Sequence, residues 1–134
     1  MATRSRIGIQ NPDGSILSCY CHNDGYIDAP HGVGHHLATY FQTPEKARAL
    51  IDMGDRSTLD VNEQTPSVFT DLLTFGRIYG RHDTMPKTSP DMVSFKELFE
   101  EFNYLYTGGR WQVCTGEKVW LDLVVAQVAT VLDQ

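Results

Sequence analysis

Several features that define common protein classes are missing from this chain of 134 residues. No apolar run approaches the roughly 20 residues that a transmembrane helix needs, and the first residues do not resemble a secretory signal peptide. The sequence also lacks a paired Cys-x-x-Cys motif, a His-Glu-x-x-His motif and a complete phosphate-binding loop. These absences argue against a membrane protein and against the best-known metal and phosphate sites, and no motif dictates a reaction.

Cysteine and positive charge are both scarce. The chain has three cysteines, and Cys19 and Cys21 lie too close together in sequence to bridge each other comfortably. Lysine and arginine total 11 against 17 aspartates and glutamates, so the formal net charge is −6. Such a charge disfavours capture of nucleic acid or of an anionic membrane surface. We therefore expect a cytoplasmic protein with neither a membrane nor a nucleic-acid partner.

The hydrophobic pattern predicts two β-hairpins. Residues 5 to 10 and 15 to 22 alternate between apolar and polar, and turn-forming residues at 11–14 separate them. A second hairpin is predicted over residues 103–115, because Gly108-Gly109 accepts the positive φ values of a tight two-residue turn. These hairpins supply at least four strands.

Apolar residues at helical spacing predict short helices in the rest of the chain. We expect five of them: Val33 to Phe41, Pro44 to Gly54, Val68 to Tyr79, Ser94 to Phe102 and Val119 to Leu132. The last segment is predicted to be helical because of its length, although its five valines favour a strand.

A single domain spanning residues 1–134 follows from this length and pattern. Two hairpins and several short helices predict an α+β fold, in which an antiparallel sheet of four or more strands carries the helices on one face. Such a sheet has open edges that invite pairing between copies, so we expect a homo-oligomer.

The densest chemistry lies between Cys19 and Tyr26, at a turn. Aromatic rings combined with arginine are typical of a site for a nucleotide-like ligand or of a protein-binding hot spot. The candidate ligand-binding residues come from this turn, the second hairpin and the basic N-terminal segment: Tyr20, His22, Asp24, Tyr26, Arg110, Trp111, Arg4 and Arg6. Aromatic strands also build cores, so pure packing remains an alternative for this set.

Catalysis is the competing hypothesis. His22, Asp24 and His35 have side chains that suit zinc, iron or manganese, so a metal-dependent hydrolase is an alternative, although their spacing matches no established motif. A thiol–imidazole pair of Cys21 and His22 is not expected, because successive strand residues point to opposite faces. We therefore favour a non-enzymatic protein with no catalytic residue, no bound metal and no cofactor.

Parts of the chain resemble a group of small, mostly uncharacterised proteins of tailed bacteriophages, also found in some bacterial genomes. The segments that carry the resemblance are Thr3 to Ile9, Asp13-Gly14, Tyr20 to Tyr26, Leu50 to Ser57 and the hairpin with Gly108-Gly109-Arg110-Trp111. The resemblance implies a viral setting in the host cytoplasm, where such a protein would act in host takeover or counter-defence. It would occupy a host protein or sequester a nucleotide-derived immune signal. A structural or assembly protein of the virion is a further alternative.

Overall fold

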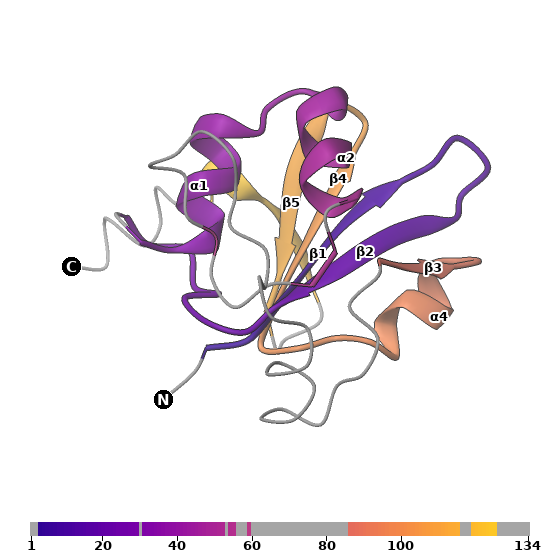
Figure 1. Cartoon of the computed structure of the whole chain (residues 1–134), viewed down its shortest axis with the longest axis horizontal. Coiled ribbons are helices and arrows are strands. Elements are labelled where there is room, and N and C mark those ends of the chain that lie inside the picture. Colours follow the sequence, from indigo (N-terminus) through magenta and orange to yellow (C-terminus); the bar gives the residue numbers. More distant parts are fainter. Residues whose placement is uncertain are drawn as a thin grey trace.

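The computed structural model describes residues 3–29, 31–52, 54–55, 59, 86–115 and 119–125. Within these residues the chain forms a six-stranded sheet with short helices packed against it (Figure 1), which is an α+β fold. The strand order is β3-β2-β1-β4-β5-β6. In chain order the strands are β1 (Ser5–Gln10), β2 (Ile16–Cys21), β3 (Lys87–Ser89), β4 (Phe102–Thr107), β5 (Arg110–Cys114) and β6 (Trp120–Asp122).

Both predicted hairpins are present. β1 and β2 pair antiparallel, with Ser5 opposite Cys21 at one end of the hairpin. β4 and β5 pair antiparallel around the Gly108-Gly109 turn, where both glycines have positive φ values, 60° and 81°. A side chain at these two positions would be strained, which is why glycine specifies this turn.

The sheet is mixed, so the prediction of an antiparallel sheet was only partly right. β1 and β4 run parallel, with Ser5 opposite Phe102 and Ile9 opposite Tyr106. A hairpin pattern fixes how two neighbouring strands pair, but it does not specify the orientation of one hairpin relative to another. Here a long connection returns the chain to the starting end of β1, as a parallel pair requires.

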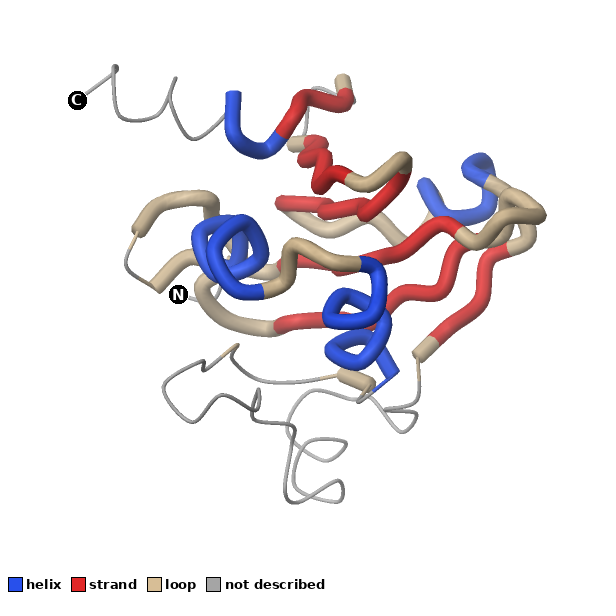
Figure 2. The backbone as a smooth tube through the Cα atoms, turned by 90° about the horizontal axis from the view of Figure 1, so that it is seen from above, coloured by secondary structure: helices blue, strands red, loops and turns tan. Residues whose placement is uncertain are grey.

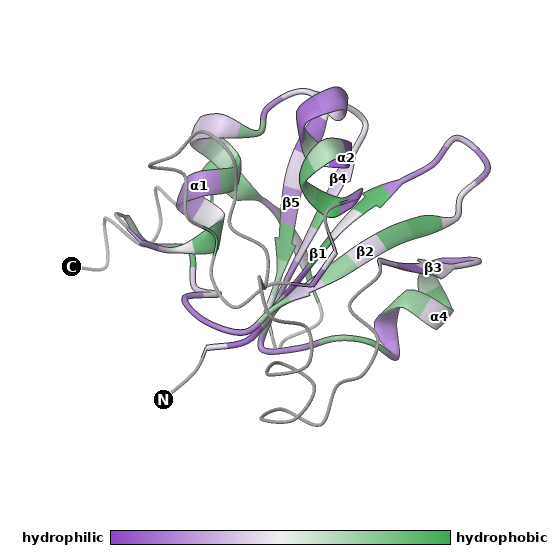
Figure 3. Cartoon of the chain, viewed as in Figure 1, coloured by the Kyte–Doolittle hydropathy of each residue, from purple (hydrophilic) through white to green (hydrophobic). Residues whose placement is uncertain are grey.

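Helices α1 (Val33–Tyr40) and α2 (Pro44–Asp52) cover one face of the sheet. Their buried residues form one apolar core with the inward side chains of the strands: Ile7, Ile9, Cys19, Cys21, Tyr104, Tyr106, Trp111 and Val113 from the sheet, with Val33, Leu37, Ala47, Leu50 and Ile51 from the helices. Figure 3 shows these hydrophobic stretches along the central strands and on α1 and α2. We call this side the α1 face.

Helix α4 (Met92–Lys96) lies on the opposite side of the sheet, the α4 face, as Figure 2 shows. Phe95 is fully buried there against Ile16 and Leu105. Gly8 provides the space, because a Cβ at this position would lie 3.1 Å from the Phe95 ring. The prediction that the helices pack on one face is therefore wrong for α4. Ile16, Leu105 and Phe95 form a second, smaller core on this face.

Helix boundaries follow their capping residues. The Thr43 hydroxyl accepts a hydrogen bond from the Lys46 backbone N–H (3.2 Å) at the start of α2, as a Thr-Pro sequence predicts. Helix α4 begins at Met92 instead of Ser94, because the Asp91 carboxylate accepts the Ser94 N–H (2.8 Å) and caps the helix there. It ends at Lys96, and Phe102 belongs to β4.

The segment predicted as a C-terminal helix begins as a strand. Trp120–Asp122 form β6, which pairs antiparallel with β5, and residues 123–125 then turn helical. The strand propensity of the valine-rich segment prevails at this point because β5 offers an open edge. The helix predicted over Val68 to Tyr79 lies outside the described residues. Among those that are described, no helix is long and apolar enough to span a bilayer.

Candidate functional site

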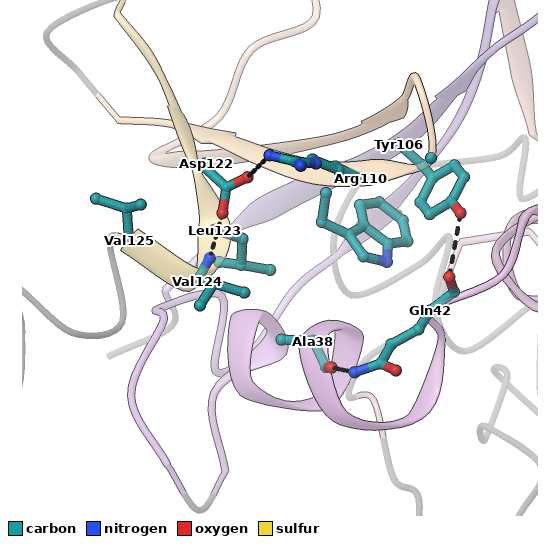
Figure 4. Close-up of a pocket in the computed structure, with 10 residues that line it drawn as sticks. Ala38, Gln42, Tyr106, Arg110, Asp122, Leu123, Val124 and Val125 are labelled. Carbon is teal, nitrogen blue, oxygen red and sulfur yellow. Dashed lines mark hydrogen bonds and ion pairs between the residues drawn. The ribbon is translucent and has the colours of Figure 1, made fainter.

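A pocket of about 550 Å³ opens on the α1 face, beside strands β5 and β6 (Figure 4). It lies between the end of α1, the start of β5 and the end of β6. Its lining residues are Ala38, Gln42, Tyr106, Gly109, Arg110, Trp111, Asp122, Leu123, Val124 and Val125. Pockets for small molecules are typically about 300–1,000 Å³, mostly apolar, with a few polar groups that fix the ligand's orientation. Both the size and the lining of this pocket fit that description.

Two aromatic residues form a fixed inner wall. The Trp111 indole N–H donates a hydrogen bond to the Phe41 carbonyl (2.7 Å), and the Tyr106 hydroxyl donates to the Gln42 carbonyl (3.1 Å). The two rings meet edge to face, with centroids 5.2 Å apart. These contacts tie the end of α1 to the sheet, so the wall is held in place from both sides.

One ion pair marks the rim of the pocket. Arg110 Nη1 lies 3.6 Å from Asp122 Oδ2, and the two side chains are 77% and 30% exposed. Asp122 also accepts the Val124 backbone N–H through Oδ1 (3.0 Å). An exposed pair of this kind contributes about 0–1 kcal/mol, so Arg110 can exchange Asp122 for another anion at little cost.

The sheet separates the predicted site residues into two groups. Tyr20 lies opposite Arg6 near the start of β1, whereas Trp111 lies opposite Tyr106, level with Ile9 near its end. The register also places Tyr20 on the α4 face and Trp111 on the α1 face. Arg110 and Trp111 therefore line the pocket, and the six other predicted residues lie outside it. The two groups are apart because β2 runs away from its hairpin turn toward Cys21, whereas β5 begins directly after the Gly108-Gly109 turn.

Tyr20 in β2 and His22, which directly follows the strand, point to the same side, as predicted, and hydrogen-bond through the Tyr20 hydroxyl and His22 Nδ1 (2.7 Å). Tyr20 is buried, as is Arg6, whose Nη1 donates to the Ser18 hydroxyl (3.1 Å). Arg4 is exposed. The burial of Tyr20 and Arg6 favours a packing role for these two residues.

Asp24 and Tyr26 belong to the turn that leads into α1. The Tyr26 hydroxyl donates to Asp24 Oδ1 (3.1 Å), and partial burial together with this hydrogen bond raises the pKa of the phenol. Beneath the turn, the Tyr104 hydroxyl donates to the Gly25 carbonyl (2.6 Å), and burial raises the pKa of Tyr104 well above its usual value. A Cβ on Gly25 would lie 2.8 Å from the Thr3 carbonyl oxygen. This turn is closely packed against the sheet.

The catalytic alternatives gain no support from the described residues. These contain no group of three or more His, Cys, Asp or Glu side chains that could hold a metal ion, so His22, Asp24 and His35 do not form a metal site together. Cys21 lies in the core of the α1 face, and its thiol donates to the Asn23 carbonyl (3.4 Å), whereas His22 is bonded to Tyr20.

Reasoning from sequence missed the residues that complete the pocket. Gln42 follows α1, and Asp122 and Leu123 fall in the segment predicted to be helical. Only the strand propensity of that segment could have indicated that it returns beside β5.

No protein-family model, no curated protein and no solved structure matches this chain. The fold and the pocket therefore define its class by themselves. It is an α+β protein with a ligand-sized pocket beside a mixed sheet.

Proposed function

We propose that this chain is a non-enzymatic binding protein that holds a nucleotide-like small molecule in the pocket between α1 and the β5–β6 strands. One observation carries the proposal. A ligand-sized pocket with aromatic and aliphatic walls has one exposed arginine, Arg110, among its described lining residues. Apolar walls suit a planar ring system, and an arginine at the rim suits an anionic group attached to that ring.

Arg110 would bind the anionic part of such a ligand. Its guanidinium presents several N–H donors in one plane and can form two parallel hydrogen bonds to a phosphate. Asp122 would remain satisfied in part by the Val124 N–H when Arg110 moves to the ligand. The site therefore needs no rearrangement of the sheet to accept an anion.

The resemblance to phage proteins suggests the biological role. A small binding protein in an infected cell could sequester a nucleotide-derived immune signal, and it would then act in counter-defence or host takeover. Sequestration requires only tight binding, and the aromatic and aliphatic walls together with Arg110 supply contacts for it.

Occupation of a host protein is the second candidate. Val124 and Val125 are exposed at the pocket and would contact an apolar side chain of a partner. Exposed apolar groups of this kind are typical of protein interfaces when they form a contiguous patch. This candidate uses the same pocket with a different occupant.

Native mass spectrometry of the full chain purified from bacteria, followed by titration with nucleoside phosphates and cyclic dinucleotides, tests the proposal. We expect a nucleotide-type ligand to bind the wild type and to bind the Arg110→Ala variant at least tenfold more weakly. Arg4→Ala is the matched control, because Arg4 is an exposed arginine at the other end of the sheet.

Three outcomes would contradict the proposal. If no nucleotide binds, while a host protein is captured by the wild type and lost on Val124→Asp, the second candidate replaces it. If Arg4→Ala weakens binding as much as Arg110→Ala does, the pocket is not the site. A large symmetric assembly indifferent to small ligands would indicate a virion protein.

A further inference from the structure

The two edges of the sheet differ in how they are protected. β3 forms one edge, and Pro86, Lys87 and Pro90 lie in it or directly beside it. Proline and lysine are residues with which natural sheets prevent unwanted strand pairing. β6 forms the other edge, and its three residues, Trp120–Asp122, include neither. Among the described strands, none pairs with its outer side.

Exposed apolar side chains gather at this unprotected edge. Six large hydrophobic residues of the described chain are exposed, and four of them lie within residues 119–125. Leu121, in β6, is 50% exposed, and Val119, which directly precedes β6, is 59% exposed. Exposure of branched apolar side chains to water at an open edge is unfavourable, and a partner strand would bury them.

The register of the sheet fixes which backbone groups face outward. Thr107 and Arg110 close the two-residue turn, so alternate residues of β5 from Arg110 onward bond to β4, and Val113 bonds to Leu121 of β6. The N–H and C=O groups of Trp120 and Asp122 then point away from the sheet. An added antiparallel strand would bond to these two residues.

We infer that two copies of this chain associate through β6, antiparallel across a two-fold axis, so that their sheets join into one. Leu121 then lies on the axis opposite Leu121 of the second copy, and Trp120 lies opposite Asp122. This register satisfies the outward groups of both edges at once, and each copy covers the exposed Leu121 of the other.

The local charge of this edge permits a second copy as its occupant. Asp122 is the acidic residue of β6, and Arg110 neutralises it at 3.6 Å. The edge is therefore neutral although the chain carries a net charge of −6. In the proposed register each Asp122 faces a tryptophan and not another acid. A basic partner, which the net charge would otherwise attract, would find no unpaired carboxylate on β6. The backbone register of β6, which carries the inference, is the same whether or not a ligand draws Arg110 away from Asp122.

Sedimentation velocity and native mass spectrometry of the full chain at micromolar concentration test this interface. We expect a dimer for the wild type and at least a tenfold weaker dimer for Leu121→Lys, because two lysines would meet on the axis. Val93→Lys is the matched control, since Val93 is an exposed valine (72%) on α4, and it should dimerise like the wild type.

A mixing experiment separates a lost interface from a damaged fold. Leu121→Lys and Leu121→Glu should each be monomeric, and an equimolar mixture should form a heterodimer because the two charges then attract on the axis. Circular dichroism should match the wild type for both. The inference is overturned by a monomeric wild type, by Leu121→Lys dimers of unchanged affinity, by the loss of dimers in Val93→Lys, or by folded variants that fail to form the heterodimer.

Discussion

Single residues decide how firmly the pocket wall is anchored. Trp111→Phe keeps an aromatic ring but removes the indole N–H that bonds to the Phe41 carbonyl, and both residues are buried. We expect a loss of about 1–3 kcal/mol in the free energy of unfolding, because a buried acceptor is left unpaired. Urea unfolding followed by circular dichroism measures it.

Tyr106→Phe serves as the comparison for this prediction. Its hydroxyl bonds to the carbonyl of Gln42, an exposed residue whose carbonyl can turn to water instead. A loss of about 0.5–1 kcal/mol is expected. Equal losses for the two variants would mean that burial of the acceptor does not set the cost.

Tyr20, His22 and Trp111 show what can be inferred from sequence at the scale of single residues. The period of a strand dictated that Tyr20 and His22 share a face, and the structure confirms it. The strand period could not show whether a helix covers that face of the sheet. It also could not show that Trp111 lies on the opposite face. Which residues form a site depends on contacts between segments far apart in sequence. The pattern of one strand does not specify those contacts.

At the scale of elements, the capping of α4 gives the structure a pH dependence. Hydrogen bonds from Ser94 lower the pKa of the Asp91 carboxyl in the folded chain. A lowered folded pKa means that the charged cap stabilises the fold above the unfolded pKa of about 3.9 and that this contribution is lost as the pH falls through the folded value.

The Ser94 amide reports this change directly. Its NMR chemical shift should titrate with a midpoint below about 3.9 in the wild type. Asp91→Asn should abolish the titration while keeping the cap, since asparagine is an equally good N-cap residue. A Ser94 shift that titrates unchanged in Asp91→Asn would assign the effect to another group.

Elements with their own local signals were predicted well from sequence, and those formed by neighbours were not. Glycine turns specified both hairpins, and Thr43-Pro44 specified the start of α2. The parallel pairing of β1 with β4 and the recruitment of Trp120–Asp122 as a strand depend on which edges are open after the rest has folded. The strand propensity of the valine-rich segment favours a strand there, but no local residue pattern specifies the partner strand in either case.

At the scale of the whole molecule, the charge of −6 predicts how salt affects association. Two acidic copies repel each other at long range, and salt screens this repulsion over a Debye length of about 10 Å at 0.1 M. Raising NaCl from 0.05 to 0.5 M should therefore tighten the dimer severalfold, as measured by sedimentation velocity. A dimer that weakens with salt would be held by ion pairs and not by the apolar edge.

The parallel contact between β1 and β4 also bears on how this protein folds. It joins parts of the chain that are far apart, as illustrated by the hydrogen bond from the Thr107 hydroxyl to Gln10 Oε1, across 97 positions. Each hairpin closes a short loop and can form early, but the sheet is complete only when this long loop closes. During synthesis on the ribosome, the first hairpin must therefore wait with one edge unpaired until residues beyond Thr107 have emerged.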